Sequence, residues 1–98
     1  MPFRHVVMFT WTDEVDADHV ARVRAGLDRM PTVIDTIRDY VHGPDVGESD
    51  GAYDYVVVAD FDDIDGYRTY RDHPDHQQLI QDLIAGRVAA RAAVQYDT

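Results

Sequence analysis

The chain has 98 residues, the size of one small domain, and 45% of them are hydrophobic, enough to form a core. A formal net charge of −10, with no lysine, disfavours nucleic acid and anionic membranes as partners, because both are bound through basic groups. No apolar run approaches the ~18 residues of a membrane span and no signal peptide is evident, so we expect a cytoplasmic protein. The absence of cysteine excludes disulfides, thiol nucleophiles and thiolate metal sites.

The N-terminal segment has the pattern of a β-strand. Residues 3–11 alternate between two faces and are rich in β-branched and aromatic side chains, which favour extended backbone. One face carries Phe3, His5, Val7, Phe9 and Trp11, and the other carries Arg4, Val6, Met8 and Thr10. Both faces are largely apolar at their centre, so we expect both to be covered.

An amphipathic helix is predicted after this strand. Asp16 is a suitable N-cap, and hydrophobic residues recur at helical spacing at Val20, Val23, Leu27 and Met30. We expect Pro31 to end this helix, because proline lacks the N–H group that a helix interior requires. His19 and His42 are expected on the solvent side.

Two further strands are predicted in the middle of the chain. Residues 37–42 form the weaker strand and residues 53–61 the stronger one, with glycine- and proline-containing turn sequence between them. Antiparallel pairing of the first strand with residues 53–61 is expected to give the pairs Val7–Val57, Phe9–Tyr55, His5–Ala59 and Arg4–Asp60. The last of these pairs joins opposite charges across the two strands, which favours this register.

The segment from Tyr70 to His76 predicts a corner between two helices. A helix that begins after Asp63 is expected to end near Asp72, because Pro74 disfavours helical backbone at the residue before it. Proline suits the first turn of the next helix, which places His76 in that turn. The positive end of the helix dipole then keeps this imidazole neutral and able to accept a proton. On local sequence alone, histidines that merely cap a helix–corner–helix joint explain the motif as well.

The predicted elements follow the order β-α-β-β-α-β in a single domain over residues 1–98. After the corner, a second helical stripe at Leu79, Ile80, Leu83 and Ile84 leads to a stop at Gly86 and a last strand over residues 88–97. This order predicts an α+β, ferredoxin-like fold, with a four-stranded antiparallel sheet and helices on one face. The helix-free face is expected to carry Val6, Met8, Val56, Val58 and Ala93. Such an apolar face predicts a second sheet from a symmetric partner, that is, a homodimer.

Several segments resemble the stress-responsive A/B-barrel (Dabb) family, in the right order and over nearly the whole chain. They are His5-Val6-Val7-Met8-Phe9, Val41-His42-Gly43-Pro44-Asp45, the strand from Tyr53 to Phe61, and Tyr70-x-x-His73-Pro74-x-His76. The resemblance implies a homodimer in which two sheets close into a dimeric α+β barrel. Some plant members are polyketide cyclases that close a ring without a cofactor, and this implies His5 and His76 as catalytic residues with Tyr70 beside them. Leu27 stands near the position where those cyclases place a pocket tyrosine, so the chain departs from them there.

The residues themselves are compatible with a site between the sheet and the helices. His5 lies on the strand face that the helices cover, and Tyr70 and His76 approach from the helical layer. A neutral base, an orienting partner and a hydroxyl group in an apolar pocket are what proton abstraction next to a carbonyl needs, without a metal or a nucleotide. We therefore predict His5, His76 and Tyr70 as catalytic residues. The predicted pocket, for a small apolar or aromatic ligand, is lined by Val7, Phe9, Leu27, Tyr55, Ala59, Tyr67, His73 and Leu79.

Two classes of function are compatible with these features. One is a cofactor-independent lyase or cyclase that acts on an aromatic or polyketide-like molecule. The other is a non-catalytic dimer, ligand-binding or stress-associated, in which His5 is a satisfied core residue. Cofactor-free monooxygenases of the wider dimeric barrel superfamily are a third alternative. A zinc site built from His5, His73 and His76 lacks an evident fourth ligand, so no metal and no cofactor are predicted.

Overall fold

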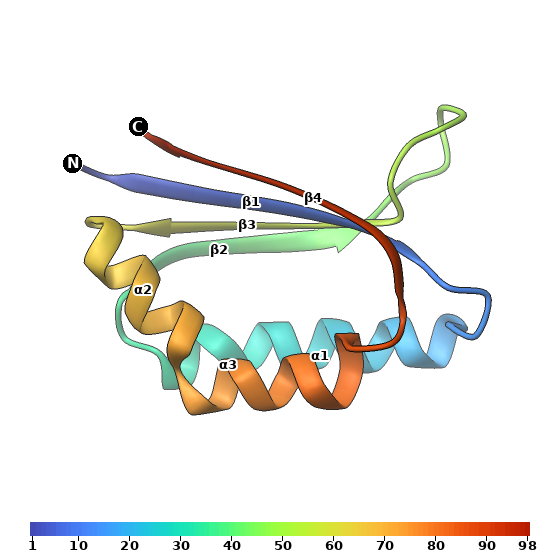
Figure 1. Cartoon of the computed structure of the whole chain (residues 1–98), viewed down its shortest axis with the longest axis horizontal. Helices are drawn as coiled ribbons and strands as arrows, with labels where there is room; N and C mark the ends of the chain where they lie inside the picture. Colours follow the sequence, from blue (N-terminus) through green and yellow to red (C-terminus); the bar gives the residue numbers. More distant parts are fainter.

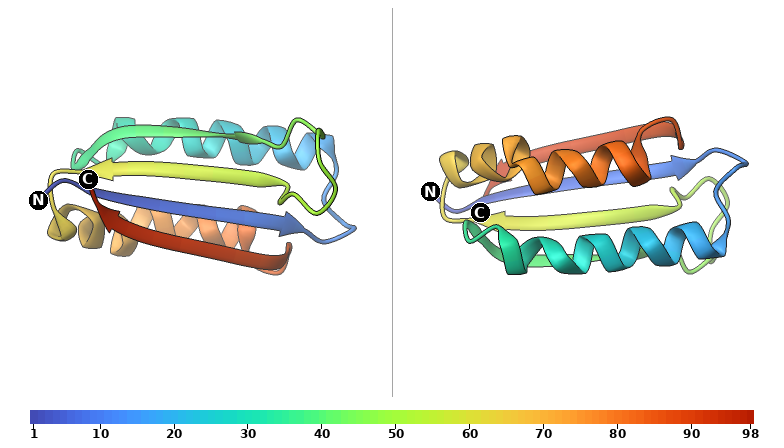
Figure 2. Two further views of the ribbon diagram at one scale, coloured as in Figure 1. Left: turned by 90° about the horizontal axis from the view of Figure 1, so that it is seen from above. Right: turned by 90° about the horizontal axis from the view of Figure 1, so that it is seen from below.

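The computed structural model describes residues 1–98 and has the predicted ferredoxin-like architecture (Figure 1). Its elements are β1 (Phe3–Trp11), α1 (Ala17–Val33), β2 (Ile37–Pro44), β3 (Tyr55–Phe61), α2 (Ile64–Asp72), α3 (Pro74–Leu79), the π-helix η1 (Ile80–Ile84) and β4 (Val88–Asp97). The strands form one antiparallel sheet in the order β2-β3-β1-β4. All the helices cover the same face of the sheet (Figure 2). Helix α1 packs along β2, α2 contacts β1, β2 and β3, and α3 and η1 lie on the side of β1 and β4.

The two central strands pair in the predicted register. His5 lies opposite Ala59, and the flanking pairs are Arg4–Asp60, Val7–Val57 and Phe9–Tyr55. Arg4 holds Asp60 through two hydrogen bonds, Nε–Oδ1 at 2.7 Å and Nη2–Oδ2 at 3.0 Å. Alternate residues of both strands are buried against the helices. Burial of alternate side chains fixes the register, because a slip of one residue would turn every buried side chain to the other face.

Helix α1 begins as predicted and ends later than predicted. The side chain of Asp16 caps its first turn by accepting from the backbone N–H of His19 at 2.8 Å. Pro31 does not end the helix, which continues to Val33. Met30 and Ile34 are each only 1% exposed, and the N–H of Ile34 bonds to the carbonyl of Met30 at 2.9 Å. Packing of this last turn against the sheet thus outweighs the hydrogen bond that proline removes.

The expectation that His19 and His42 face solvent is wrong. His19 is 4% exposed, and its Nε2 donates to the carbonyl of Leu83 at 2.7 Å. The ring of His42 bridges the hydroxyl of Tyr55 at 2.7 Å and Asp28 Oδ1 at 2.8 Å. Both imidazoles are tolerated inside because each finds polar partners there.

The corner between the second pair of helices forms as predicted. Helix α2 begins after its N-cap Asp63 and ends at Asp72, and Pro74 opens α3. His73 caps α3, since its Nδ1 accepts from the backbone N–H of Asp75 at 3.1 Å. Beyond α3 the helix widens into η1, which ends at Ile84. Gly86 lies in the turn that follows, where its positive φ of 77° suits glycine.

Strand β4 differs from the prediction in the face that Ala93 occupies. The register against β1 places Ala93 opposite Val7, on the helix-covered face. The helix-free face instead receives Ala92 and Val94, which join Val6, Met8, Val41, Val56 and Val58. Small residues occupy both faces of β4, and its pairing shifts between Thr10 and Trp11, so alternation in the sequence does not identify the buried face.

Candidate functional site

A cavity of about 380 Å³ lies between β1 and the helices that follow the corner. Its volume is within the range of about 300–1,000 Å³ that is typical of small-molecule sites. Most of its 17 lining residues are hydrophobic. They are His5, Val7, Phe9, Leu27, Val57, Tyr67, Tyr70, Arg71, His76, Gln77, Leu79, Ile80, Ile84, Ala85, Gly86, Val88 and Arg91.

The imidazole of His76 is held in one orientation by the corner. Its Nδ1 lies 3.1 Å from the carbonyl oxygen of Arg71, so Nδ1 carries the proton and donates it. The ring also packs on Tyr70, with centroids 4.1 Å apart. Burial lowers the pKa of His76 below its usual value, and the nearby His73 lowers it further, against a raising effect of the Arg71 carbonyl. Nε2 of His76 is therefore left as an unprotonated acceptor beside the cavity.

His5 is held from the edge strand β4. Its Nδ1 lies 3.0 Å from Oε1 of Gln95, to which it donates, and its ring packs on Tyr67 with centroids 4.9 Å apart. The side chain is deeply buried, and this burial is the main reason that the pKa of His5 is lowered. Positive charge on Arg91 or His76 lowers it further, whereas the bond to Gln95 raises it. His5 thus also presents a neutral ring with a free Nε2.

Tyr70 contributes its ring to the cavity and directs its hydroxyl group elsewhere. The hydroxyl lies 2.9 Å from that of Tyr40 on β2, and Tyr40 does not line the cavity. Burial raises the pKa of Tyr70 to about 12 and also raises the pKa of Tyr40. Both phenols therefore stay protonated near neutral pH, and neither is a base.

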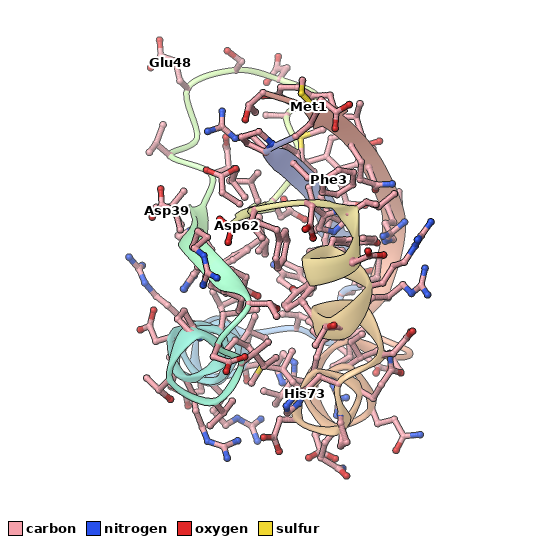
Figure 3. All side chains as sticks on the ribbon, turned by 90° about the vertical axis from the view of Figure 1, so that its left-hand side faces the viewer. Met1, Phe3, Asp39, Glu48, Asp62 and His73 are labelled. Carbon is pink, nitrogen blue, oxygen red and sulfur yellow. The ribbon has the colours of Figure 1, made fainter.

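Five of the eight predicted pocket residues line the cavity and three do not. Those in the lining are Val7, Phe9, Leu27, Tyr67 and Leu79. Tyr55 is buried in the core and bonded to His42, and Ala59 is fully buried in the sheet. His73 caps the corner in the helical layer, well separated from Phe3 on the first strand (Figure 3). Sheet parity alone placed Tyr55 and Ala59 near the site, but Val57 is the only residue of β3 that lines the cavity, and the other strand residues in the lining belong to β1 and β4.

Sequence reasoning missed the contribution of β4. Gln95, which orients His5, and Arg91, which lines the cavity, stand opposite His5 and Phe9 in the β1–β4 ladder. Alternation along residues 88–97 puts Arg91 and Gln95 on the same face as Ala93, which was expected on the helix-free side. The face on which Arg91 and Gln95 lie follows from the register of β4 against β1. The alanines of β4 are similar on both faces, so the sequence does not indicate that register.

The side chains do not group into a metal site, since three or more His, Asp or Glu residues nowhere converge. None of the helices is both long and apolar enough to cross a membrane.

These features define a ferredoxin-like α+β subunit with a histidine-lined cavity between its sheet and its helices. The chain belongs to the Dabb family, described as the stress responsive A/B barrel domain, whose sequence profile it matches over residues 3–98. The resemblance seen in the sequence is thereby confirmed.

Several known proteins are similar to this chain in sequence or in fold. A dimeric ferredoxin-like protein of unknown function from Thermobifida fusca is 42% identical, with a TM-score of 0.93 over 100% of this chain and 92% of that one. An uncharacterized protein of Streptomyces coelicolor is 31% identical over 77 residues, which are 76% of this chain and 78% of that protein. The hydroxynitrile lyase of Passiflora edulis is 10% identical, with a TM-score of 0.84 over 97% of this chain and 91% of its own, and this likeness concerns the fold alone.

Proposed function

We propose that the protein is a cofactor-independent enzyme of lyase or cyclase type, which removes a proton next to the carbonyl of an aromatic or polyketide-like molecule. One observation carries this proposal. His5 and His76 each bond an oxygen acceptor through Nδ1 and leave a neutral Nε2 in the same apolar cavity. A neutral imidazole in an apolar cavity, with a pKa lowered by burial, is suited to general-base catalysis at neutral pH.

The proposed reaction assigns the first step to His76. Its Nε2 takes a proton from the carbon beside the carbonyl, and the substrate becomes an enolate while the ring becomes an imidazolium. The enolate then either attacks a second carbonyl carbon, which closes a ring, or expels a leaving group. The imidazolium returns its proton to the oxygen or to the leaving group, so the enzyme ends as it began. The aromatic rings of Phe9, Tyr67 and Tyr70 supply an apolar wall for a flat substrate.

We also propose that the protein is a homodimer, joined through the helix-free face of the sheet. Two observations support this. That face is apolar at its centre, and the 42% identical Thermobifida fusca protein is described as dimeric. A large apolar face of this kind is unusual on a monomer.

Exchange of carbon-bound hydrogen for deuterium tests the base directly. In D₂O, the methyl signal of acetophenone in the proton NMR spectrum should decay faster with the protein than with buffer. His76→Ala should slow this decay by about 10²–10⁴-fold, the usual contribution of a positioned base. His5→Ala should slow it too, whereas the matched control His73→Ala, which removes an imidazole outside the cavity, should lower stability and leave the rate largely intact.

The same experiment separates catalysis from binding alone. If the protein binds acetophenone but exchanges its protons no faster than free imidazole does, the enzyme proposal is wrong and the non-catalytic ligand-binding dimer takes its place. If His73→Ala abolishes exchange while His76→Ala does not, the assignment of the base is wrong.

A further inference from the structure

Arg91 differs from the other arginines of this chain in its surroundings. Four of the nine arginines pair with aspartates, and these are Arg4, Arg38, Arg68 and Arg71. Arg71 also lines the cavity, but both carboxylate oxygens of Asp72 bond to its guanidinium, at 2.9 and 3.0 Å. Arg91 takes part in none of these pairs and lines the cavity with its charge uncompensated.

The fold places this charge at the edge of the cavity. Arg91 stands opposite Phe9 on the helix-covered face of the edge strand β4, and its side chain is exposed. The charge of Arg91 acts on His5 within the cavity, where it helps to lower the pKa of His5, although burial has the larger effect. The cation therefore sits at the mouth of an apolar space that leads toward the two histidines.

The charge of the cavity is opposite to that of the molecule. The chain carries 19 acidic residues and a formal net charge of −10, yet no aspartate or glutamate lines the cavity. Its histidines are held neutral by burial, and Arg71 is neutralised by Asp72. The negative charge on most of the molecular surface would repel an anion, whereas the positive charge of Arg91 would attract it at the mouth of the cavity.

We propose that the cavity binds an amphipathic carboxylic acid, whose aromatic or aliphatic body fills the apolar interior and whose carboxylate pairs with Arg91 at the mouth. A guanidinium group presents a planar fork of donors that matches the two oxygens of a carboxylate. This inference rests on the proposed function only in taking the cavity as the binding site. It adds the chemical class of the substrate: a carboxylic acid that bears the reacting carbonyl along its apolar body.

Paired ligands that differ only in charge test this inference. Isothermal titration calorimetry of the full chain at pH 7.5 and low salt compares 4-phenylbutanoate and 6-phenylhexanoate with their primary amides. The acids should bind about tenfold more tightly than the amides, which corresponds to about 1.4 kcal/mol. Arg91→Gln should remove this preference by weakening the acids and leaving the amides unchanged. Arg24→Gln, which removes the same charge from outside the cavity, should change neither.

Each other outcome overturns the inference. Equal binding of acids and amides by the wild-type protein would show that the cavity ignores charge, although the cavity would remain a binding site and the base could still act. If Arg71→Gln removes the preference for acids and Arg91→Gln does not, the carboxylate binds at Arg71 and its assignment to Arg91 is wrong. Absence of binding by every ligand would overturn both this inference and the proposed function. If Arg91→Gln fails to fold, Arg91→Leu and Arg91→Lys decide the matter, because only Lys should retain part of the preference.

Discussion

His5 and His76 are oriented by partners of different kinds, and this difference favours His76 as the base. The acceptor for His76 is the backbone carbonyl of Arg71, which cannot become a donor, so Nδ1 must carry the proton. The acceptor for His5 is the side-chain amide of Gln95, which can present either oxygen or nitrogen by rotating. The main chain thus fixes the tautomer of His76 that leaves Nε2 unprotonated. At His5 the same tautomer depends on the orientation of the Gln95 amide, which can change.

The lowered pKa of His76 predicts how the folding stability depends on pH. The unfolded chain has a histidine pKa near its usual ~6.5, above that of the folded chain, so between the two values the unfolded state binds more protons. The stability contribution is fully present above pH ~6.5 and is lost as pH falls toward the folded-state pKa. The free energy of unfolding should therefore decrease between pH 7 and pH 5.

Denaturant unfolding of wild type and His76→Gln at several pH values checks this. The variant should lose less stability over the same interval, with a slope smaller by up to about 1.4 kcal/mol per pH unit for the missing proton. Above pH 7 the two proteins should show the same pH dependence of the free energy of unfolding, and their stabilities should differ only by a constant amount. Parallel slopes between pH 7 and pH 5 would show that His76 is not buried as the structure places it.

At the level of elements, the sequence predicts β1 and β3 better than it predicts α1 and β4. The two central strands alternate cleanly, and Arg4 and Asp60 mark their register, so pattern and charge agree. In α1 the buried positions are His19, Val23, Leu27 and Met30, which keep helical spacing. Hydrophobicity alone selects Val20 in place of His19, because the partner that permits burial of His19 lies on η1, far along the chain.

The candidate site was predictable to the extent that local rules position its residues. Pro74 sets the corner, and the corner sets His76, so this residue was found from the sequence. Strand parity likewise placed His5 on the covered face. Arg91 and Gln95 were missed because their side depends on the pairing of β4, which is a property of the assembled sheet and not of any short segment.

The bond from His19 to Leu83 supports the π-helix that walls the cavity. At the end of η1 the N–H of Ala85 bonds to the carbonyl of Ile80, and the carbonyl of Leu83 accepts a hydrogen bond from His19 on α1 at 2.7 Å. His19→Leu introduces an apolar side chain of similar bulk and removes the donor to the Leu83 carbonyl, so it should cost about 1–3 kcal/mol of unfolding free energy. His19→Gln retains an N–H donor and should cost less. Thermal unfolding of the two variants, compared with wild type, measures this.

If His19→Leu is as stable as the wild-type protein, the bond to Leu83 contributes nothing net, and the packing of α1 alone holds η1. If both variants lose equal stability, the shape of the imidazole matters and its donor does not.

At the scale of the whole molecule, both the shape and the apolar composition of the helix-free face are compatible with the proposed dimer. Loop residues 45–54 rise from the sheet on the side opposite the helices (Figure 1). Between this loop and the strands lies an open hollow of about 540 Å³, bounded by Met8, Gly43, Pro44, Asp45, Val46, Ala52, Tyr53, Tyr55 and Val56. A twofold axis through the apolar centre of the sheet would bring each copy's loop toward the other copy's sheet.

Val58 lies at the centre of this face, between Val6 on β1 and Val41 on β2. In the proposed dimer, Val58→Asp buries a charge without a partner and should raise the dissociation constant about a hundredfold or more, equivalent to roughly 3 kcal/mol. Sedimentation velocity should show wild-type dimers at micromolar concentration and monomers or insoluble protein for Val58→Asp. Ile64→Asp is the control, because it places the same charge at an exposed position of α2, on the face of the sheet opposite the proposed interface. A monomeric wild-type protein, or a variant that dimerises as well as the control, would contradict the proposed interface and leave the apolar face of the sheet without an explanation.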